Sequence, residues 1–418
     1  MLIGRVGNYL RRLEHSSLLP KRTEHQFRRD SGALPPPLTQ LSEEEHALKE
    51  TVRKFAHDFV RPLVRKMDET SSLDPNIING VFENGLMGMA IPEKYGGSAA
   101  SFFSVILTVQ ELAKIDASVA LFVDLQNALV TPFLLEYGSP AQQDHYLPKL
   151  NKDWIGCFCV SEAGSGSDAF AMKTTAKEDG DDYVINGQKM WITSSGHANL
   201  FFVMANADPA KGHRGITCFL VERTAKGLSV GKPEDKLGLR ASSTCPINFD
   251  DVRVPKSAIL GKVGQGYKIA IGGLNHSRIG IAAQMLGLAE GCFEQTIPYL
   301  QERKQFGQRL IDFQGMQHQI ADVATDIEAA RLLVYNAARL KDAGLPYIKP
   351  GAMSKYYAAN VAAKTTSKCV EWLGGVGFTK EFPIEKYYRD CKIGAIYEGT
   401  NNIQLSTIAK LIDTEFRQ

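Results

Sequence analysis

The spacing of apolar residues changes twice along this chain, and that change limits the fold more than any other feature. Before about residue 157 and after about residue 270, apolar residues recur every three or four positions, as on one face of a helix. Between these points lie short apolar segments separated by turn residues, which is typical of strands. This helix–strand–helix order is unlike a doubly wound sheet, in which helices alternate with parallel strands.

The first region is predicted to consist of helices. Ser42 followed by Glu45 forms a capping box, in which each side chain accepts from the backbone amide of the other residue. Apolar residues then follow at helical spacing: Leu48, Val52, Phe55, Phe59 and Leu63. Further helices are expected over residues 77–86, 104–115 and 142–150.

The middle region is predicted to be an antiparallel barrel or sandwich. Asn186-Gly187 separates two apolar segments, residues 183–185 and 188–193, and this pair supplies the positive φ angles of a type I′ hairpin turn. Further strands are expected over residues 200–205, 215–221, 228–232 and 247–254. Roughly six or seven short strands without helices between them favour that architecture.

The last region returns to the helical repeat. Helices are predicted over residues 281–301, 319–343, 353–373 and 403–416, enough for a four-helix bundle. We therefore expect an α+β chain with an N-terminal α-helical domain over 41–156, a central antiparallel β-barrel domain over 157–270 and a C-terminal helical bundle over 271–418.

The first thirty residues differ in charge from the rest. Residues 1–29 carry seven basic and two acidic side chains, with apolar residues roughly on one helical face. This composition predicts a mitochondrial transit peptide over residues 1–30, although a disordered basic tail is the alternative. Residues 31–40, with three consecutive prolines, are expected to be a linker.

Composition excludes several other classes. With 48 basic and 46 acidic residues the net charge is +2, so nothing in the charge favours a nucleic-acid partner. No uninterrupted apolar run reaches the roughly 18 residues of a membrane span, so no integral membrane segment is expected. The seven cysteines are scattered and the nine histidines lack ligand spacing, so we expect buried thiols and no metal site.

One loop of small residues stands at the start of the strand region. Residues 161–168 contain Gly164-x-Gly166, which taken alone matches part of a dinucleotide-binding fingerprint. That fingerprint needs a following helix and a parallel sheet, whereas strands come next here. What remains is a loop of hydroxyls and free amides able to approach a polar ring closely, or a plain turn.

A single glutamate precedes the last helix. Glu398 follows an apolar Ile396-Tyr397 pair and precedes a glycine, so its carboxylate can point into a dry cleft. Most lone glutamates are surface charges, and Thr400 or Asn401 next to it can serve simply as a helix cap.

Taken together, five segments resemble the acyl-CoA dehydrogenase family over residues 40–415: 161–168, 191–193, 303–307, 373–377 and 397–400. Within that family the chain is most similar to the short/branched-chain (2-methylbutyryl-CoA) members, in residues 236–246, 278–288 and 366–369. The resemblance implies the helical, β-barrel and four-helix-bundle fold, non-covalent FAD and a homotetramer.

The resemblance also implies a set of site residues. Those bordering the flavin ring would be Phe158, Cys159, Val160, Ser161, Glu162, Ala163, Gly164, Ser165, Gly166, Ser167, Trp191, Ile192 and Thr193. Those holding the rest of FAD would be Arg303, Gln314, Glu371, Trp372, Leu373, Gly374, Gly375, Thr400, Asn401 and Asn402, partly from a neighbouring subunit. Those contacting substrate would be Ser167, His213, Tyr267, Asn275, His276, Ser277 and Arg278.

The activity implied is the FAD-dependent α,β-dehydrogenation of a short or branched acyl-CoA to a trans-2-enoyl-CoA in the mitochondrial matrix. Glu398 would be the catalytic base, since Ser277 stands where some relatives carry theirs. Electrons would pass to an electron-transferring flavoprotein, in fatty-acid or branched-chain amino-acid breakdown. Three alternatives stay open: a 2-methyl-enoyl-CoA reductase running in reverse, an acyl-CoA oxidase, and a flavin- or CoA-binding assembly factor without activity.

Overall fold

The computed structural model describes residues 37–169 and 171–417. The predicted transit peptide, and most of the predicted linker, lie outside the described residues. The chain divides into two units, Met1–Pro37 and Leu38–Gln418, and the second unit contains every helix and strand of the described residues.

Helices form the first region, as predicted. The capping box at Ser42 and Glu45 is present and opens α2. The predicted helices over 77–86, 104–115 and 142–150 correspond to α4, α5 and α8. The elements are α2 (Glu43–Phe55), α3 (Val64–Thr70), α4 (Pro75–Glu83), α5 (Phe102–Ala113), α6 (Ala117–Asp124), the π-helical turn η4 (Leu125–Val130), α7 (Thr131–Tyr137) and α8 (Pro140–Lys152).

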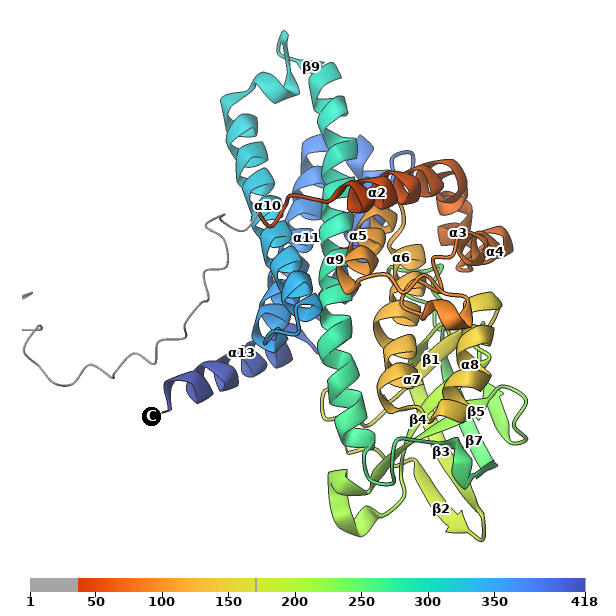
Figure 1. Cartoon of the computed structure of the whole chain (residues 1–418). Coiled ribbons are helices and arrows are strands. Elements are labelled where there is room, and N and C mark those ends of the chain that lie inside the picture. The colour runs from red at the N-terminus through yellow and green to blue at the C-terminus, as the bar shows by residue number, and fades with distance from the viewer. Residues whose placement is uncertain (1–36, 170, 418) are drawn as a thin grey trace, which may run out of the picture. The chain divides into compact units, whose positions relative to one another are not determined.

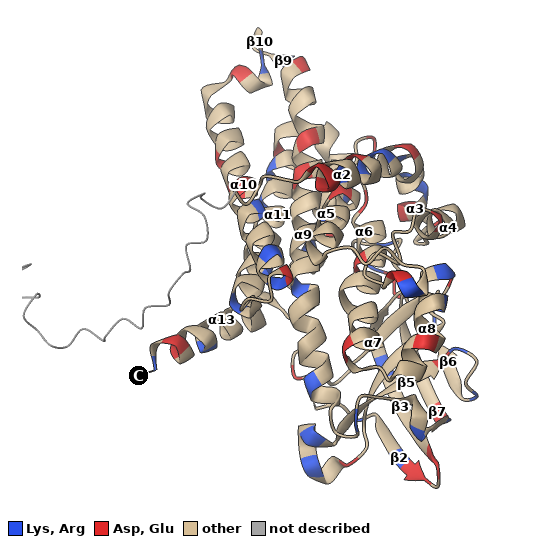
Figure 2. Cartoon of the chain, in the orientation of Figure 1, with Lys and Arg blue, Asp and Glu red and all other residues tan. Residues whose placement is uncertain are grey.

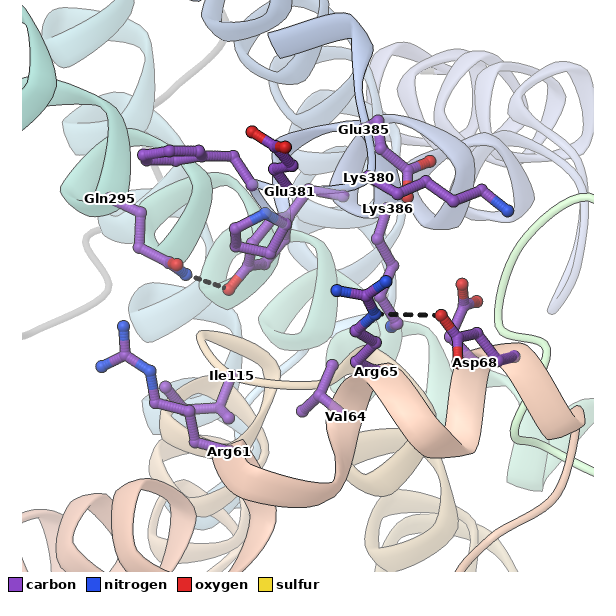
Figure 3. Close-up of a pocket in the computed structure, with 14 residues that line it drawn as sticks. Arg61, Val64, Arg65, Asp68, Ile115, Gln295, Lys380, Glu381, Glu385 and Lys386 are labelled. Carbon is purple, nitrogen blue, oxygen red and sulfur yellow. Dashed lines mark hydrogen bonds and ion pairs between the residues drawn. The ribbon is translucent and has the colours of Figure 1, made fainter. Parts of the chain in front are cut away.

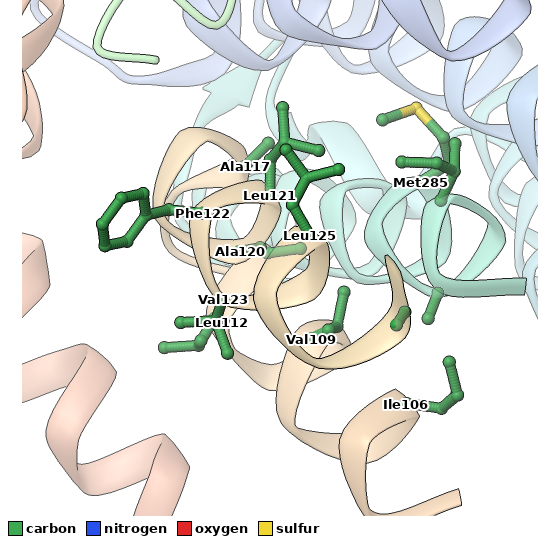
Figure 4. Close-up of a cluster of buried hydrophobic side chains, with 14 of the residues drawn as sticks. Ile106, Val109, Leu112, Ala117, Ala120, Leu121, Phe122, Val123, Leu125 and Met285 are labelled. Atoms are coloured by element: carbon green, nitrogen blue, oxygen red, sulfur yellow. The ribbon is translucent and has the colours of Figure 1, made fainter. Parts of the chain in front are cut away.

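The sequence pattern missed the helical run from α6 to α7. Nearly every side chain of α6 and η4 is buried, so no polar face exists to reveal a helical period. Figure 4 shows side chains of α5, α6 and α9, including Val109, Leu121 and Met285, in one apolar cluster. By length and composition Ala117–Tyr137 could cross a membrane, but 89% of its most apolar 18-residue window is buried inside the molecule. It is a core segment here.

The middle region is one eight-stranded sheet in the order β6-β7-β3-β2-β4-β5-β8, with β1 paired to β4. Most pairs are antiparallel, but β1–β4 and β2–β4 are parallel, which makes the sheet mixed. The strands are β1 (Gly156–Cys159), β2 (Thr175–Asp179), β3 (Asp182–Thr193), β4 (Leu200–Asn206), β5 (Ile216–Glu222), β6 (Leu228–Val230), β7 (Thr244–Pro255) and β8 (Ile259–Leu260).

The predicted hairpin turn at Asn186-Gly187 is wrong. β3 runs without a break through this pair, and the hairpin instead closes at Gly180-Asp181, where β2 meets β3. The pairing of β3 with β7 shifts register between Ile185 and Gly187. A Cβ on Gly187 would lie 2.7 Å from the Cα of Thr174, so glycine permits close backbone approach at this bulge rather than a turn.

Long helices dominate the last region. They are α9 (Gly266–Glu302), α10 (Gln314–Asp342), α11 (Ile348–Leu373), α12 (Ile384–Asp390) and α13 (Asn401–Phe416), with the two-residue strands β9 (Lys304–Gln305) and β10 (Gln308–Arg309) after α9. α9 packs against α5 and α11 and connects the sheet side of the molecule to the bundle (Figure 1).

α9 begins well before the predicted start at residue 281. Its first turns carry Gly272, Gly273 and Gly280, which weaken the helical signal in sequence. The structure uses two of these glycines for close packing. A Cβ on Gly273 would lie 2.1 Å from the ring of Phe133, and one on Gly280 would lie 2.0 Å from Asp124 Oδ1.

Charged side chains are spread over the described part of the chain. Both Lys or Arg (blue) and Asp or Glu (red) are scattered over the helices and the sheet (Figure 2). This agrees with the nearly balanced charge of the sequence.

Candidate active site

A cavity of about 390 Å³ lies where η4, the sheet, α9 and the segment before α13 meet. Its apolar wall is formed by Leu125 and Leu129 from η4, Phe158 from β1, and Ile271 and Leu274 from α9. Its polar lining comprises Ser161, Ser167, Thr193, Arg278, Glu398 and Thr400. The cavity therefore combines an apolar slot with a few polar groups, as small-molecule sites do.

Glu398 projects into this cavity from a strained turn. Its φ angle is 52°, a left-handed conformation that is uncommon for a residue with a Cβ. Ser277 Oγ donates a hydrogen bond of 2.5 Å to Glu398 Oε2. Burial raises the pKa of Glu398, while this hydrogen bond and the positive charges of Arg278 and Lys355 act in the opposite direction.

A second carboxyl group, that of Asp124, lies close enough to Glu398 to be affected by its charge. Asp124 is fully buried at the end of α6, and neither of its oxygens has a hydrogen-bond partner among the described residues. Burial, and then the charge of Glu398, raise the pKa of Asp124 well above its usual range.

The loop after β1 is held in place by Glu162. Its carboxylate accepts from the amide of Lys173 at 2.7 Å and from the amide of Thr174 at 3.0 Å. It also pairs with the buried Lys189 Nζ at 2.8 Å. The Glu162 side chain thus shapes the loop that carries Ser161 and Ser167, and it does not line the cavity.

Strand geometry decides which neighbouring residues reach the cavity. Side chains alternate along a strand, so Phe158 of β1 lines the cavity while Cys157 and Cys159 pack into the core of the sheet. On β3 the register shifts again between Lys189 and Ile192, and Trp191 adopts a φ of 63°. This bulge turns the Trp191 indole, 55% exposed, toward the cavity rim.

The start of α13 faces the same cavity. Thr400 caps the helix by accepting from the Ile403 amide at 3.3 Å, and Asn401 and Asn402 are its first two residues. The amides of a first helical turn and the helix dipole favour a negatively polarised group. An open aromatic face, hydroxyls on a small-residue loop and a helix N-terminus are features that suit a flavin ring and its polar edge.

The remaining residues predicted to hold FAD lie elsewhere. Arg303 and Gln314 flank the β9–β10 hairpin, at the end of α9 remote from the sheet (Figure 1). Trp372 donates to Gln319 Oε1 at 3.2 Å, which brings the end of α11 beside the start of α10. Arg303, Gln314, Glu371, Gly374 and Gly375 are exposed, whereas Trp372 and Leu373 are buried in the core. Within one chain, this group does not line the cavity.

The predicted substrate contacts are also divided. Arg278 lines the cavity and donates to Asn275 Oδ1 at 2.9 Å. The rings of His213 and Tyr267 lie 4.9 Å apart, between η5 (Pro209–Gly215) and the start of α9. His276 packs against Tyr347 outside the cavity lining, and burial lowers its pKa to about 4.

Sequence reasoning missed several residues of this site. The lining also includes Ala169, Ile271, Leu274, Ile396, Tyr397, Gly399 and Ile403. Lys355 and Gln404 lie behind Glu398 and were not predicted either. Lys355 could have been found from the helical repeat. Residues 352, 355, 359 and 362 lie on one face of α11, and the other three are alanines.

A second cavity, of about 240 Å³, lies between α3 and α12 (Figure 3). Its charged residues are largely paired: Arg389 binds Asp68 and Glu385, and Lys386 binds Asp116 and Asp390. Among the described residues no cluster of three or more His, Cys, Asp or Glu could hold a metal ion. The seven cysteines are buried and unpaired.

Comparison with known proteins covers nearly the whole described chain. Models of the N-terminal, middle and C-terminal domains of acyl-CoA dehydrogenase match residues 42–153, 157–252 and 264–412. The mitochondrial short/branched chain specific acyl-CoA dehydrogenase of Bos taurus is 58% identical over 401 residues, which are 96% of this chain and 93% of that protein.

Solved structures give the same result. Butyryl-CoA dehydrogenase from Megasphaera elsdenii superposes with a TM-score of 0.87 at 37% identity, covering 89% of this chain and 99% of the other. A chain from a structure described as the electron transferring flavoprotein of Acidaminococcus fermentans gives 0.88 at 38% identity, covering 91% and 100%.

Proposed function

Because the chain belongs to the acyl-CoA dehydrogenase family, we propose that it oxidises short 2-methyl-branched acyl-CoA thioesters to trans-2-enoyl-CoA, with Glu398 as the catalytic base. The family depends on FAD. The observation that carries the proposal is that Glu398 lines a largely apolar cavity together with Trp191 and the residue 161–167 loop.

The first step is removal of the α-proton of the thioester. Burial of Glu398 raises the pKa of its carboxyl group, and a higher pKa makes its carboxylate a stronger base. Ser277 holds the carboxylate through Oε2, which leaves Oε1 to take the proton. The apolar side chains of Leu125, Leu129 and Leu274 exclude water from the slot.

Polarising the thioester carbonyl is the second requirement, because its α-proton is only weakly acidic. The backbone N–H of Glu398 donates to no acceptor among the described residues, so it is available to the thioester oxygen. The chemistry that FAD supplies when bound is acceptance of the β-hydrogen with its two electrons. Phe158, Val160, Ser161, Trp191, Thr193 and Thr400 would hold its ring.

We assign the other half of FAD to Arg303, Gln314 and residues 371–375 of a neighbouring subunit. In one chain Arg303, Gln314, Glu371, Gly374 and Gly375 are exposed, and none of the assigned residues lines the cavity, which supports a site completed by a second copy. The assembly we propose is a homotetramer. We propose the domain limits 41–156, 157–270 and 271–418; α9 begins at Gly266, inside the second range.

We place the enzyme in the mitochondrial matrix and assign an electron-transferring flavoprotein as its acceptor. The basic N-terminal sequence and the mitochondrial relative support the location. The similarity to a chain from an electron-transferring flavoprotein structure supports the acceptor. The pathway would be branched-chain amino-acid or fatty-acid breakdown.

Turnover with defined substrates tests this function. The purified protein should carry FAD and should reduce electron-transferring flavoprotein faster with 2-methylbutyryl-CoA or isobutyryl-CoA than with butyryl-CoA or octanoyl-CoA. Faster turnover with octanoyl-CoA would overturn the substrate assignment. Stoichiometric peroxide formation in air would identify an oxidase, and net reduction of 2-methyl-enoyl-CoA by the reduced acceptor would identify a reductase.

A further inference from the structure

Lys355 is an unusual lysine in this structure. It lies on α11 with no exposed surface, among the small side chains of Ala352, Ala358 and Ala359. Its ammonium group donates a hydrogen bond of 2.8 Å to the carbonyl oxygen of Gly399, the residue after Glu398. An ammonium buried in this way loses its hydration, and a hydrogen bond to one backbone carbonyl replaces only part of it.

The segment that Lys355 holds is the one that aims Glu398. Gln404 Nε2 donates to the same Gly399 carbonyl at 2.8 Å and to the carbonyl of Glu398 at 3.2 Å. These donors fix both peptide units that follow the strained Glu398 backbone. A left-handed residue with a Cβ persists only when its surroundings hold it there, and here the holding groups are Lys355 and Gln404.

The charged groups facing Lys355 come from two other elements. Glu398, before α13, stabilises the ammonium form, whereas Arg278 of α9 destabilises it. Burial, the largest effect, acts together with Arg278 against Glu398 and lowers the pKa of Lys355 to about 7. In return, the ammonium favours the ionised form of Glu398.

We propose that Lys355 is a positioning residue for the catalytic base: it fixes the Glu398–Gly399 backbone through the Gly399 carbonyl and places a positive charge behind the Glu398 carboxylate. This inference rests on the proposed role of Glu398. Lys355 does not line the cavity, so it acts through Glu398 rather than by touching the substrate.

Two variants separate the charge from the hydrogen bond. Lys355→Met keeps the length of the side chain and removes both, whereas Gln404→Leu removes a neutral donor to the same carbonyl and leaves the charge. Ser354→Ala is the matched control, because Ser354 is buried beside Lys355 but donates to Gly351 O in its own helix.

The readout is the rate of flavin reduction by 2-methylbutyryl-CoA in single-turnover experiments across pH. Lys355→Met should reduce the limiting rate roughly 10- to 100-fold through misplacement of the base. The rate falls at low pH as Glu398 becomes protonated, which gives the acid limb of the pH–rate profile. Lys355→Met should also shift this limb to higher pH by about one unit, since loss of a nearby cation raises the pKa of a carboxyl group. Gln404→Leu should slow the reaction without moving the limb, and Ser354→Ala should change neither.

The outcomes distinguish this inference from the function on which it rests. If Glu398→Gln is inactive while Lys355→Met keeps the wild-type rate and acid limb, the role of Lys355 is overturned and the base assignment stands. If Glu398→Gln remains active, the proposed function fails first. Should Lys355→Met lose its flavin, Lys355→Gln decides, because it retains an N–H donor without charge: an acid limb at the wild-type position would overturn the role of the charge.

Discussion

At the scale of single residues, the chemistry depends on how one carboxyl group is kept basic and aimed. Burial of Glu398 raises its pKa, and the Ser277 hydroxyl opposes that rise through a hydrogen bond of 2.5 Å. Burial strengthens the carboxylate as a base, and Ser277 fixes it through Oε2.

The direction in which Ser277→Ala shifts the pH dependence of activity can therefore be predicted. The hydrogen bond favours the ionised form of Glu398, so its loss raises the pKa of Glu398 further. Because the base must be ionised, activity is lost as pH falls through that pKa. We expect the acid limb of the kcat/KM profile to move to higher pH, with a rate close to wild type on the alkaline plateau. An unchanged limb would contradict the role of this hydrogen bond.

The sequence allowed prediction of candidate site residues that belong to a local motif. It did not allow prediction of those that are distant along the chain and come close only in the folded structure. Glu398 and the residue 161–167 loop carry recognisable neighbours in the chain. Lys355 lies on α11 and Asp124 at the end of α6. The packing of α11 against α9 and α13, and of α6 against α9, brings them near Glu398. Their distance along the sequence leaves no local pattern to detect.

At the scale of elements, amphipathic segments were predictable, and fully buried ones only in part. α4, α8 and α10 present one apolar face, and their positions were predicted to within a few residues. α5 was predicted as well, although nearly all of its residues are buried. α6 and η4 are buried on all sides, and the first turns of α9 are rich in glycine. At β3 a glycine needed for close approach was interpreted as a turn glycine.

That reinterpretation of Gly187 leads to a stability prediction. Gly187→Ala would place a Cβ 2.5 Å from Thr174 Oγ1 and 2.7 Å from Thr174 Cα, at a φ of 146°. We expect a loss of about 1–3 kcal/mol in the free energy of unfolding, measured by denaturant titration. Gly315→Ala is the control, because no atom lies within 4 Å of its added Cβ. Equal stability of the two variants would contradict the bulge packing.

At the scale of the whole molecule, the site needs all three regions. η4 supplies one wall of the cavity, the sheet supplies the residue 161–167 loop and Trp191, and the region after residue 266 supplies Arg278 on α9 and Glu398 before α13. Yet Arg303 and residues 371–375 lie away from that cavity in one chain. If they hold FAD, they do so in a second copy.

Subunit complementation tests this arrangement. Arg303→Ala should weaken FAD retention in the neighbouring site, and Glu398→Gln should inactivate its own site while leaving its Arg303 intact. Mixed tetramers of the two variants should therefore contain sites with both a native base and a native Arg303. We expect co-expressed protein to show more activity than the sum of the separate variants. Strict additivity would contradict a site shared between subunits.

The most direct test of the central claim is the reduction of bound flavin by 2-methylbutyryl-CoA, followed as loss of flavin absorbance in wild type and Glu398→Gln. The substitution preserves the shape of the side chain and removes its basicity. We predict that the variant retains FAD and is reduced at least ~10²-fold more slowly. A variant that binds FAD and is reduced at a rate near that of wild type would contradict the assignment of Glu398 as the base.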